Sequence, residues 1–244
     1  MVNKYFTTEV KPTTTASLQA GSTMGNGDVL SDWTAFNIPR GAAKLVGVTV
    51  LLRGTNGARQ EKSIDIYFAK DVNGIAPGSL GTISDTADGS KYQNHLIGAA
   101  HINASDYKDG LDIMAVATAG HGGSTTQMPS LVLEGDPITG TNVGYDKLYC
   151  ALMAKATHNW ASTLDINGTM STSSPTLTVD TIDARLAVAP GDVLYDEDEL
   201  LLGTVKSVDS ATQITMESNL SNASSNDKKV YNGSPITLVL SFEK

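Results

Sequence analysis

Apolar and polar residues alternate over short stretches along most of the chain, whereas long windows with apolar residues at helical spacing are almost lacking. Residues 44–53 and 63–70 both show this alternation. In the first stretch the apolar side chains that share one face are Val46, Val48, Val50 and Leu52. The intervening Gly54-Thr55-Asn56-Gly57 is a strong turn signal, so the two stretches are predicted to form a β-hairpin.

Further short strands are predicted at 111–118, 130–134, 147–156 and 236–242, each bounded by Gly, Asn, Asp or Pro. Residues 147–156 are apolar on both faces, which is typical of a central strand. Residues 236–242 are equally apolar, and we expect them to return to the first sheet. Many short strands with turns between them predict an all-β fold, an antiparallel, jelly-roll-like β-sandwich.

A second unit is predicted at 161–232, where five short strands fall within about 60 residues. These strands are expected at 176–180, 186–188, 192–195, 200–208 and 213–217. Polar, turn-prone linkers flank them at 167–175 and 222–232. The pattern predicts a small β-barrel inserted before the last strand of a sandwich formed by residues 28–160 and 233–244. Two domains in tandem are the alternative.

The charge is unevenly distributed between these two units. The chain of 244 residues has 17 Lys and Arg against 26 Asp and Glu, a net charge of −9. Residues 161–232 contain four of the cations and eleven of the anions, a balance of −7, which leaves −2 for the rest. Clustered cations are needed to bind nucleic acid through its phosphates, so nucleic acid is not an expected partner. The predicted barrel is therefore acidic and the sandwich nearly neutral.

Targeting signals are not recognised in the sequence. No apolar run approaches the roughly 18 residues that cross a bilayer, and the N-terminal residues lack the apolar stretch of a signal peptide. We therefore expect a protein made in the cytosol without a membrane partner.

The first 27 residues are predicted to lie outside both cores. They are rich in Thr and Gly with few apolar side chains, so a disordered tail is one interpretation. An extended arm that adds a strand to a neighbouring subunit is the other, because β-branched residues suit that conformation. The candidate contact residues of such an arm are Tyr5, Phe6, Val10 and Pro12.

Catalytic and metal-binding patterns are not evident, so neither an enzyme nor a cofactor is predicted. The four histidines are dispersed and lie in no metal-binding motif: His95, His101, His121 and His158. The single cysteine, Cys150, excludes an intramolecular disulfide and is predicted to be a buried small hydrophobe. The Gly-rich Gly120–Ser124 lacks the lysine of a phosphate loop.

Carboxylates and aromatic residues give only weak indications of binding. Asp196–Glu199 is predicted to be a solvated hairpin turn, and Asp106, Asp109 and Asp112 a turn entering a strand. Sugar-binding modules display Trp or Tyr platforms, but Trp33 and Trp160 are each predicted to cover the edge of a core.

Two stretches resemble known proteins. Val188–Tyr195 followed by Leu202–Thr215 is similar to a small β-barrel module of tailed-bacteriophage virion proteins. Phe36–Ala43, leading into an alternating strand, resembles the start of a sandwich domain in phage structural proteins. The resemblance implies a non-enzymatic virion component, assembled in the host cytoplasm.

Within that class, a head decoration or cement protein bound to the outside of the shell is favoured. Its partners would be the major capsid protein and further copies of the chain, with a trimer as one assembly that the resemblance implies. A tail, baseplate or fibre-associated protein is the first alternative. A carbohydrate-binding surface protein is the second.

Overall fold

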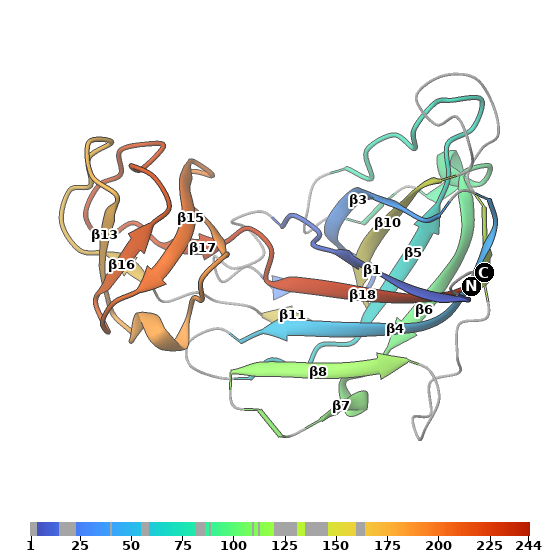
Figure 1. Cartoon of the computed structure of the whole chain (residues 1–244), viewed down its shortest axis with the longest axis horizontal. Helices are drawn as coiled ribbons and strands as arrows, with labels where there is room; N and C mark the ends of the chain where they lie inside the picture. Colours follow the sequence, from blue (N-terminus) through green and yellow to red (C-terminus); the bar gives the residue numbers. More distant parts are fainter. Residues whose placement is uncertain are drawn as a thin grey trace.

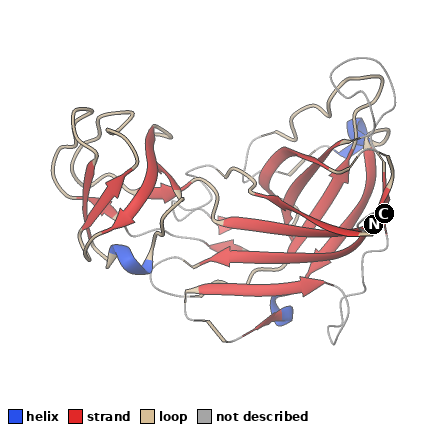
Figure 2. Cartoon of the chain, in the orientation of Figure 1, coloured by secondary structure: helices blue, strands red, loops and turns tan. Residues whose placement is uncertain are grey.

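The chain forms two lobes, a large β-sandwich and a small β-barrel (Figure 1). This computed structural model describes residues 4–14, 23–39, 41–54, 59–81, 86–87, 89–108, 110–111, 113–119, 131–134, 146–159 and 164–244. Helical structure in these residues is limited to three short 3₁₀ turns (Figure 2), η1 (Gly89–Tyr92), η2 (Ala104–Asp106) and η3 (Ala184–Leu186). The described residues include no helix that could span a membrane. The predicted fold class is confirmed.

The sandwich consists of two main antiparallel sheets. The first has the order β1 (Tyr5–Val10), β18 (Ile236–Glu243), β4 (Ala43–Arg53), β8 (Met114–Ala119) and β7 (Tyr107–Lys108), with β9 (Leu131–Leu133) also pairing with β4. The second has the order β3 (Val29–Asn37), β10 (Lys147–Ala154), β5 (Ile64–Ala69) and β6 (Leu96–Ile102). The short strands β2 (Thr23–Met24) and β11 (His158–Asn159) form a separate pair.

Alternating side chains of the two sheets meet in one apolar core. Phe36 of β3 lies at the centre, with its ring centroid 6.3 Å from Phe68 of β5 and 6.5 Å from Phe242 of β18. β10 is a central strand with both faces largely covered, as its sequence predicts. Burying apolar area at about 25 cal/mol per Å² makes such a core the main source of stability.

The predicted hairpin of residues 44–53 and 63–70 is wrong, because the two strands belong to different sheets. β4 pairs with β18 and β8, and β5 pairs with β10 and β6. Each of the two strands has one apolar face, and these faces meet across the core rather than side by side in one sheet. A turn signal alone does not distinguish these arrangements.

A β-bulge in β4 also changes the predicted face of Val46. Ser241 pairs with Gly47, whereas the next residue of β18, Phe242, pairs with Leu45, so Val46 is an extra residue. Leu45 is therefore buried, and Val46 is only half-buried. The predicted inward positions Val48, Val50 and Leu52 are confirmed.

The small lobe is a nearly closed six-stranded barrel. Its strand order is β12 (Asp165–Ile166), β13 (Thr176–Asp180), β16 (Gln213–Met216), β15 (Leu201–Val208), β14 (Val193–Asp196) and β17 (Val230–Asn232). Val230 N donates to Leu164 O at 2.8 Å, and Ile166 N donates to Lys228 O at 2.8 Å, which joins the two ends of the sheet. The barrel has its own apolar core, made only of residues between 164 and 230.

Two local predictions for the barrel are wrong. The strand expected at 186–188 is absent, because the 3₁₀ turn η3 extends to Leu186 and no strand follows at 187–188. The Asp183 carboxylate caps this turn by accepting from Arg185 N at 3.0 Å. The predicted linker 222–232 ends in strand β17, which is short and flanked by polar residues and therefore gives little periodic signal.

The barrel is an insertion rather than a second domain in tandem. The chain leaves the sandwich after β11 and returns through β18, which pairs with β4 along its whole length. Lys244 N donates to Lys4 O at 2.8 Å, so β1 begins where β18 ends. This end of the sandwich lies away from the barrel (Figure 1).

Candidate binding surfaces

The residues predicted to form arm contacts lie in β1 or just after it. The Phe6 ring stacks on Phe242 with a centroid distance of 5.0 Å, Val10 is 3% exposed, and Pro12 is also buried. Tyr5 is 62% exposed. The prediction that this stretch lies outside both cores is wrong, because β1 pairs with β18 of its own chain. Two threonines within the strand obscure its apolar alternation.

After β1, the chain runs to the junction between the two lobes. Thr14 is buried, and its backbone N–H donates to the carbonyl oxygen of Gly233 at 2.7 Å. Gly233 is the first of the three residues that connect β17 to β18. Residues 11–14 therefore connect the edge of the sandwich to the base of the barrel. Residues 1–3 and 15–22 of the predicted arm lie outside the described residues.

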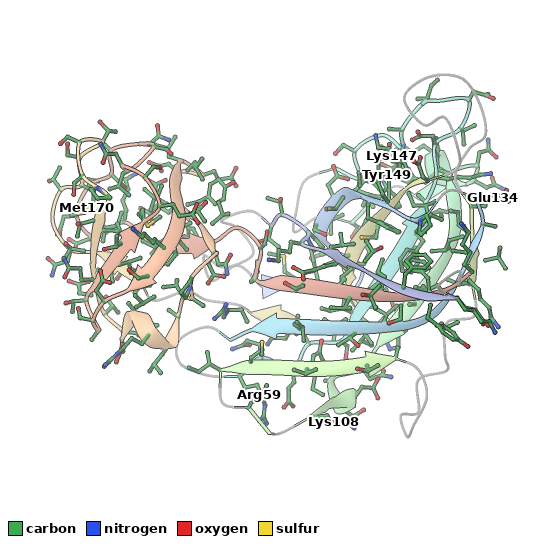
Figure 3. The ribbon with its side chains drawn as sticks, in the orientation of Figure 1. Arg59, Lys108, Glu134, Lys147, Tyr149 and Met170 are labelled. Carbon is green, nitrogen blue, oxygen red and sulfur yellow. The ribbon has the colours of Figure 1, made fainter. Side chains whose placement is uncertain are left out.

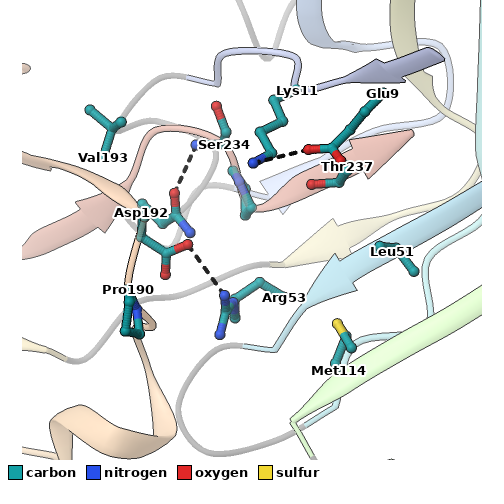
Figure 4. A pocket seen from close by; sticks show the side chains of 13 residues that line it. Glu9, Lys11, Leu51, Arg53, Met114, Pro190, Asp192, Val193, Ser234 and Thr237 are labelled. Atoms are coloured by element: carbon teal, nitrogen blue, oxygen red, sulfur yellow. Dashed lines mark hydrogen bonds and ion pairs between the residues drawn. The ribbon is translucent and has the colours of Figure 1, made fainter. Parts of the chain in front are cut away.

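A cleft of about 290 Å³ lies between the sandwich and the barrel (Figure 4). The Arg53 guanidinium at the end of β4 lies 3.2 Å from the Asp192 carboxylate of the barrel, and Lys11 pairs with Glu9 at 3.0 Å. The other Asp192 oxygen accepts from Ala189 N at 2.8 Å. Burial raises the pKa of Asp192, and the attraction of Arg53 offsets only part of that effect. These cations already have partners, so the cleft connects the lobes rather than offering an anion site.

A second pocket, of about 180 Å³, lies over the outer face of the four-stranded sheet. Three aromatic rings line this aromatic pocket: Trp33 from β3, Tyr67 from β5 and Tyr92 from the segment that covers the sheet. The Trp33 and Tyr92 rings meet edge to face, with centroids 5.8 Å apart and planes at 64°. Met153 of β10, whose register partner is Asp65, also lines the pocket. The wall is thus mainly apolar.

One carboxylate in this wall is held by a side-chain network. Asp65 Oδ1 lies 2.6 Å from His101 Nδ1, and Asn103 Oδ1 lies 2.7 Å from the other ring nitrogen, Nε2. Asp65 Oδ2 lies 3.5 Å from Lys155 Nζ. Asn103 is itself fixed, since its backbone N–H donates to Asp106 Oδ2 at 2.9 Å. The network orients the Asp65 carboxylate on the pocket wall, where Asp65 Oδ2 keeps the capacity to accept another hydrogen bond.

The outer face of the six-stranded sheet has a half-exposed, uncharged strip across its inner strands, flanked by Glu9, beside Val239, and by Lys108, beside Val116. The strand registers place Val239 beside Thr49 and Thr49 beside Thr118. In the same way, Leu51 lies between Thr237 and Val116. We call these six residues the outer sheet face. Thr49 and Thr118 share a hydroxyl hydrogen bond of 3.0 Å.

The structure places several other residues that the sequence singled out. Cys150 is fully buried, as predicted, and burial raises the pKa of its thiol to about 12. His95 Nδ1 lies 2.9 Å from Lys70 O. Within the described part of the chain, no three His, Cys, Asp or Glu residues are grouped as metal ligands would be. Other residues singled out from the sequence lie outside the described residues: Asp109, Asp112, Gly120–Ser124 with His121, the His158 side chain and Trp160.

The predicted solvated turn at Asp196–Glu199 is wrong for its first residue. The Asp196 side chain is fully buried, and its Oδ1 accepts from the backbone N–H groups of Asp198 and Leu200 at 3.0 and 3.1 Å. Its Oδ2 accepts from Ser224 Oγ at 2.7 Å. A carboxylate that closes a turn in this way is retained for the hydrogen bonds of the backbone rather than for ion binding.

Side chains outside these surfaces also pair locally (Figure 3). Lys147 Nζ lies 5.3 Å from the centroid of the Tyr149 ring, as two neighbours on β10. Burial and the Asp71 carboxylate together raise the pKa of Tyr149 above its usual range. The Lys147–Tyr149 contact and the raised pKa of Tyr149 therefore both follow from the burial of Tyr149 and its position beside Lys147 and Asp71.

Neither a protein-family model nor a curated protein matches the sequence.

Proposed function

We propose that the chain is a non-enzymatic structural protein of a tailed-phage particle, a head decoration protein that binds the outside of the shell and braces it. The proposal is supported chiefly by the small lobe. The segment that resembles the phage barrel module forms a barrel with its own core, inserted into a sandwich as a separate lobe. The inserted lobe can thus project while the sandwich makes the contacts.

The outer sheet face is the proposed contact surface with the shell. Its hydroxyl and aliphatic side chains present an uncharged strip between Glu9 and Lys108, so packing another protein against that strip costs little charge desolvation. The net charge of −7 in residues 161–232, against −2 elsewhere, keeps the barrel in solvent. The proposed partners are the major capsid protein and further copies of the chain in homo-oligomers, with the virion as location.

Electron microscopy of the particle tests the location. Copies of the protein distributed over the shell support a decoration protein. Copies confined to the tail, baseplate or fibres contradict the head assignment and favour the tail alternative. Absence from the particle contradicts both.

A pair of charge variants tests the contact surface. Thr118→Glu adds a carboxylate to the outer sheet face at an exposed position, and Thr212→Glu adds the same group at an exposed position of the barrel. The assay is co-sedimentation with shells that lack the native protein. We expect Thr118→Glu to reduce the co-sedimenting amount at least tenfold, because the new charge must be desolvated in the contact. Thr212→Glu is expected to co-sediment like the wild type. Equal co-sedimentation of both variants would exclude this face.

A further inference from the structure

We propose that the aromatic pocket binds one neutral sugar ring, a hexopyranose of a surface glycan. This goes beyond the structural role, since it would let the particle adhere to glycan-coated surfaces. The pocket lies on the four-stranded sheet, whereas the proposed shell contact lies on the six-stranded sheet. The two surfaces can therefore be occupied together.

The size of the pocket favours a single ring. Its volume of about 180 Å³ is smaller than the roughly 300 Å³ at which pockets for drug-sized ligands begin. It is open on one side, because Leu96 and Gly89 on its rim are exposed. A terminal or side-chain sugar can enter from that side while the rest of the glycan stays in solvent.

The aromatic walls suit the apolar faces of a sugar ring. A hexopyranose presents a face of C–H groups, which packs on the electron-rich face of Trp or Tyr. Trp33 and Tyr67 are partly exposed and available for this contact, while Tyr92 is buried and fixes Trp33 from the side. The Tyr92 hydroxyl donates to Ser79 O, which anchors the covering segment.

The carboxylate makes the pocket suitable for a hydroxylated ligand rather than a purely apolar one. Asp65 Oδ2 can accept a hydrogen bond from a sugar hydroxyl, and its network with His101 and Asn103 holds it in place beforehand. An apolar ligand would desolvate the carboxylate without replacing the hydrogen bonds to water, which is unfavourable.

The nearby charges favour a neutral sugar. Lys155 Nζ lies 3.5 Å from Asp65, and Lys91 Nζ lies 5.5 Å from the centroid of the Tyr92 ring. These ammonium groups repel a cationic ligand such as a quaternary amine, although three aromatic rings would otherwise suit one. Asp65 repels an anionic sugar. A neutral ring can donate to the Asp65 carboxylate without bringing a second charge into the pocket.

The pocket is proposed to bind a sugar and not to cleave it. Glycosidases generally use two carboxyl groups on either side of the scissile bond. Among the described residues that line this pocket, Asp65 is the sole carboxylate. The carboxylate of Asp32, the residue before Trp33, accepts instead from the backbone N–H groups of Trp33 and Leu80.

Calorimetry and saturation-transfer NMR with the methyl glycosides of glucose, galactose, mannose and N-acetylglucosamine test the proposal. We expect at least one of them to bind with a dissociation constant of about 1 mM, the affinity typical of a ligand of this size. Tyr67→Ala and Asp65→Asn should each weaken binding about tenfold, by loss of a stacking face and of a charged acceptor. The matched control Tyr5→Ala removes an exposed tyrosine of the other sheet and should leave binding unchanged.

The outcomes that contradict the proposal are distinct. If none of the four glycosides binds, or if tetramethylammonium or sialic acid binds in their place, the assignment to a neutral sugar is wrong. If a glycoside binds equally well to the wild type and to Asp65→Asn, the assignment of sugar binding to the aromatic pocket is wrong. Asp65→Asn keeps the size of the side chain, so this measurement remains informative even if Tyr67→Ala fails to fold.

Discussion

Substituting Phe6 by Ala tests whether β1 is an integral strand of the sandwich. Phe6 is half-buried and stacks on Phe242 at 5.0 Å with nearly parallel rings, 11° apart. Burying about half of a phenylalanine side chain contributes about 1–1.5 kcal/mol, and the ring pair adds about 0.5–1.5 kcal/mol. We therefore expect the free energy of unfolding of the sandwich to fall by about 1.5–3 kcal/mol.

Differential scanning calorimetry measures this loss directly. For a domain of this size, about 1.5–3 kcal/mol lowers the Tm of the sandwich by about 3–12 °C. Tyr5→Ala is the matched control, because it removes a neighbouring ring of the same strand that is 62% exposed, and its Tm should change by less than about 2 °C. An unchanged Tm for Phe6→Ala, or equal losses for both variants, would refute the integration of β1 into the core.

Four further predictions concern the junction (two of them), the sandwich core and the barrel. Burial raises the pKa of Asp192, so the folded protein keeps the proton on this carboxyl group to a higher pH than the unfolded chain does. In urea titrations, the free energy of unfolding of the wild type relative to that of Asp192→Asn should therefore fall as the pH rises from 3 to 7. An increase would contradict the assignment. Arg53→Ala should destabilise the protein at pH 7 by about 1–2 kcal/mol in the same assay, since it leaves the desolvated carboxylate without its partner. The buried Cys150 thiol, with its pKa raised to about 12, should resist iodoacetamide at pH 8 in the folded protein and react fully in urea; labelling of the folded protein at the rate of a free thiol would show that the core opens. Asp196→Ala should cost about 3 kcal/mol of barrel stability in calorimetry, because it leaves buried donors without an acceptor, and a cost below about 1 kcal/mol would contradict that role.

Strand positions were predictable from the sequence where periodicity is strong. Residues 147–156 and 236–242 are apolar enough to identify a central strand and a return to the first sheet, and both predictions are confirmed. Pairing was harder to predict. The strands at 44–53 and 63–70 are adjacent in the sequence but face each other across the core, because alternation reports one buried face and not the neighbour in the sheet.

The candidate sites were much less predictable than the strands. Tyr67 lies 34 positions after Trp33, and Tyr92 lies 25 positions after Tyr67. Only the pairing of β3 and β5 with β10, together with the covering segment, brings the three rings to one pocket. The alternation of residues 63–70 already places Asp65 and Tyr67 on the same polar face, which was the available signal. What covers that face is set by long-range packing and leaves no spacing pattern.

The position of β18 in the first sheet has a consequence for the order of folding during synthesis. β18 lies between β1 and β4, yet Val10 and Ile236 are 226 positions apart in the sequence. At the roughly 5–20 residues per second of translation, β1 waits about 10–45 s for its partner strand. During that time β1 and β4 each expose an unpaired edge. The barrel closes scarcely earlier, because only three residues separate its strand β17 from β18. Residues 230–244, the last 15 of the chain, therefore complete both lobes together at the end of translation.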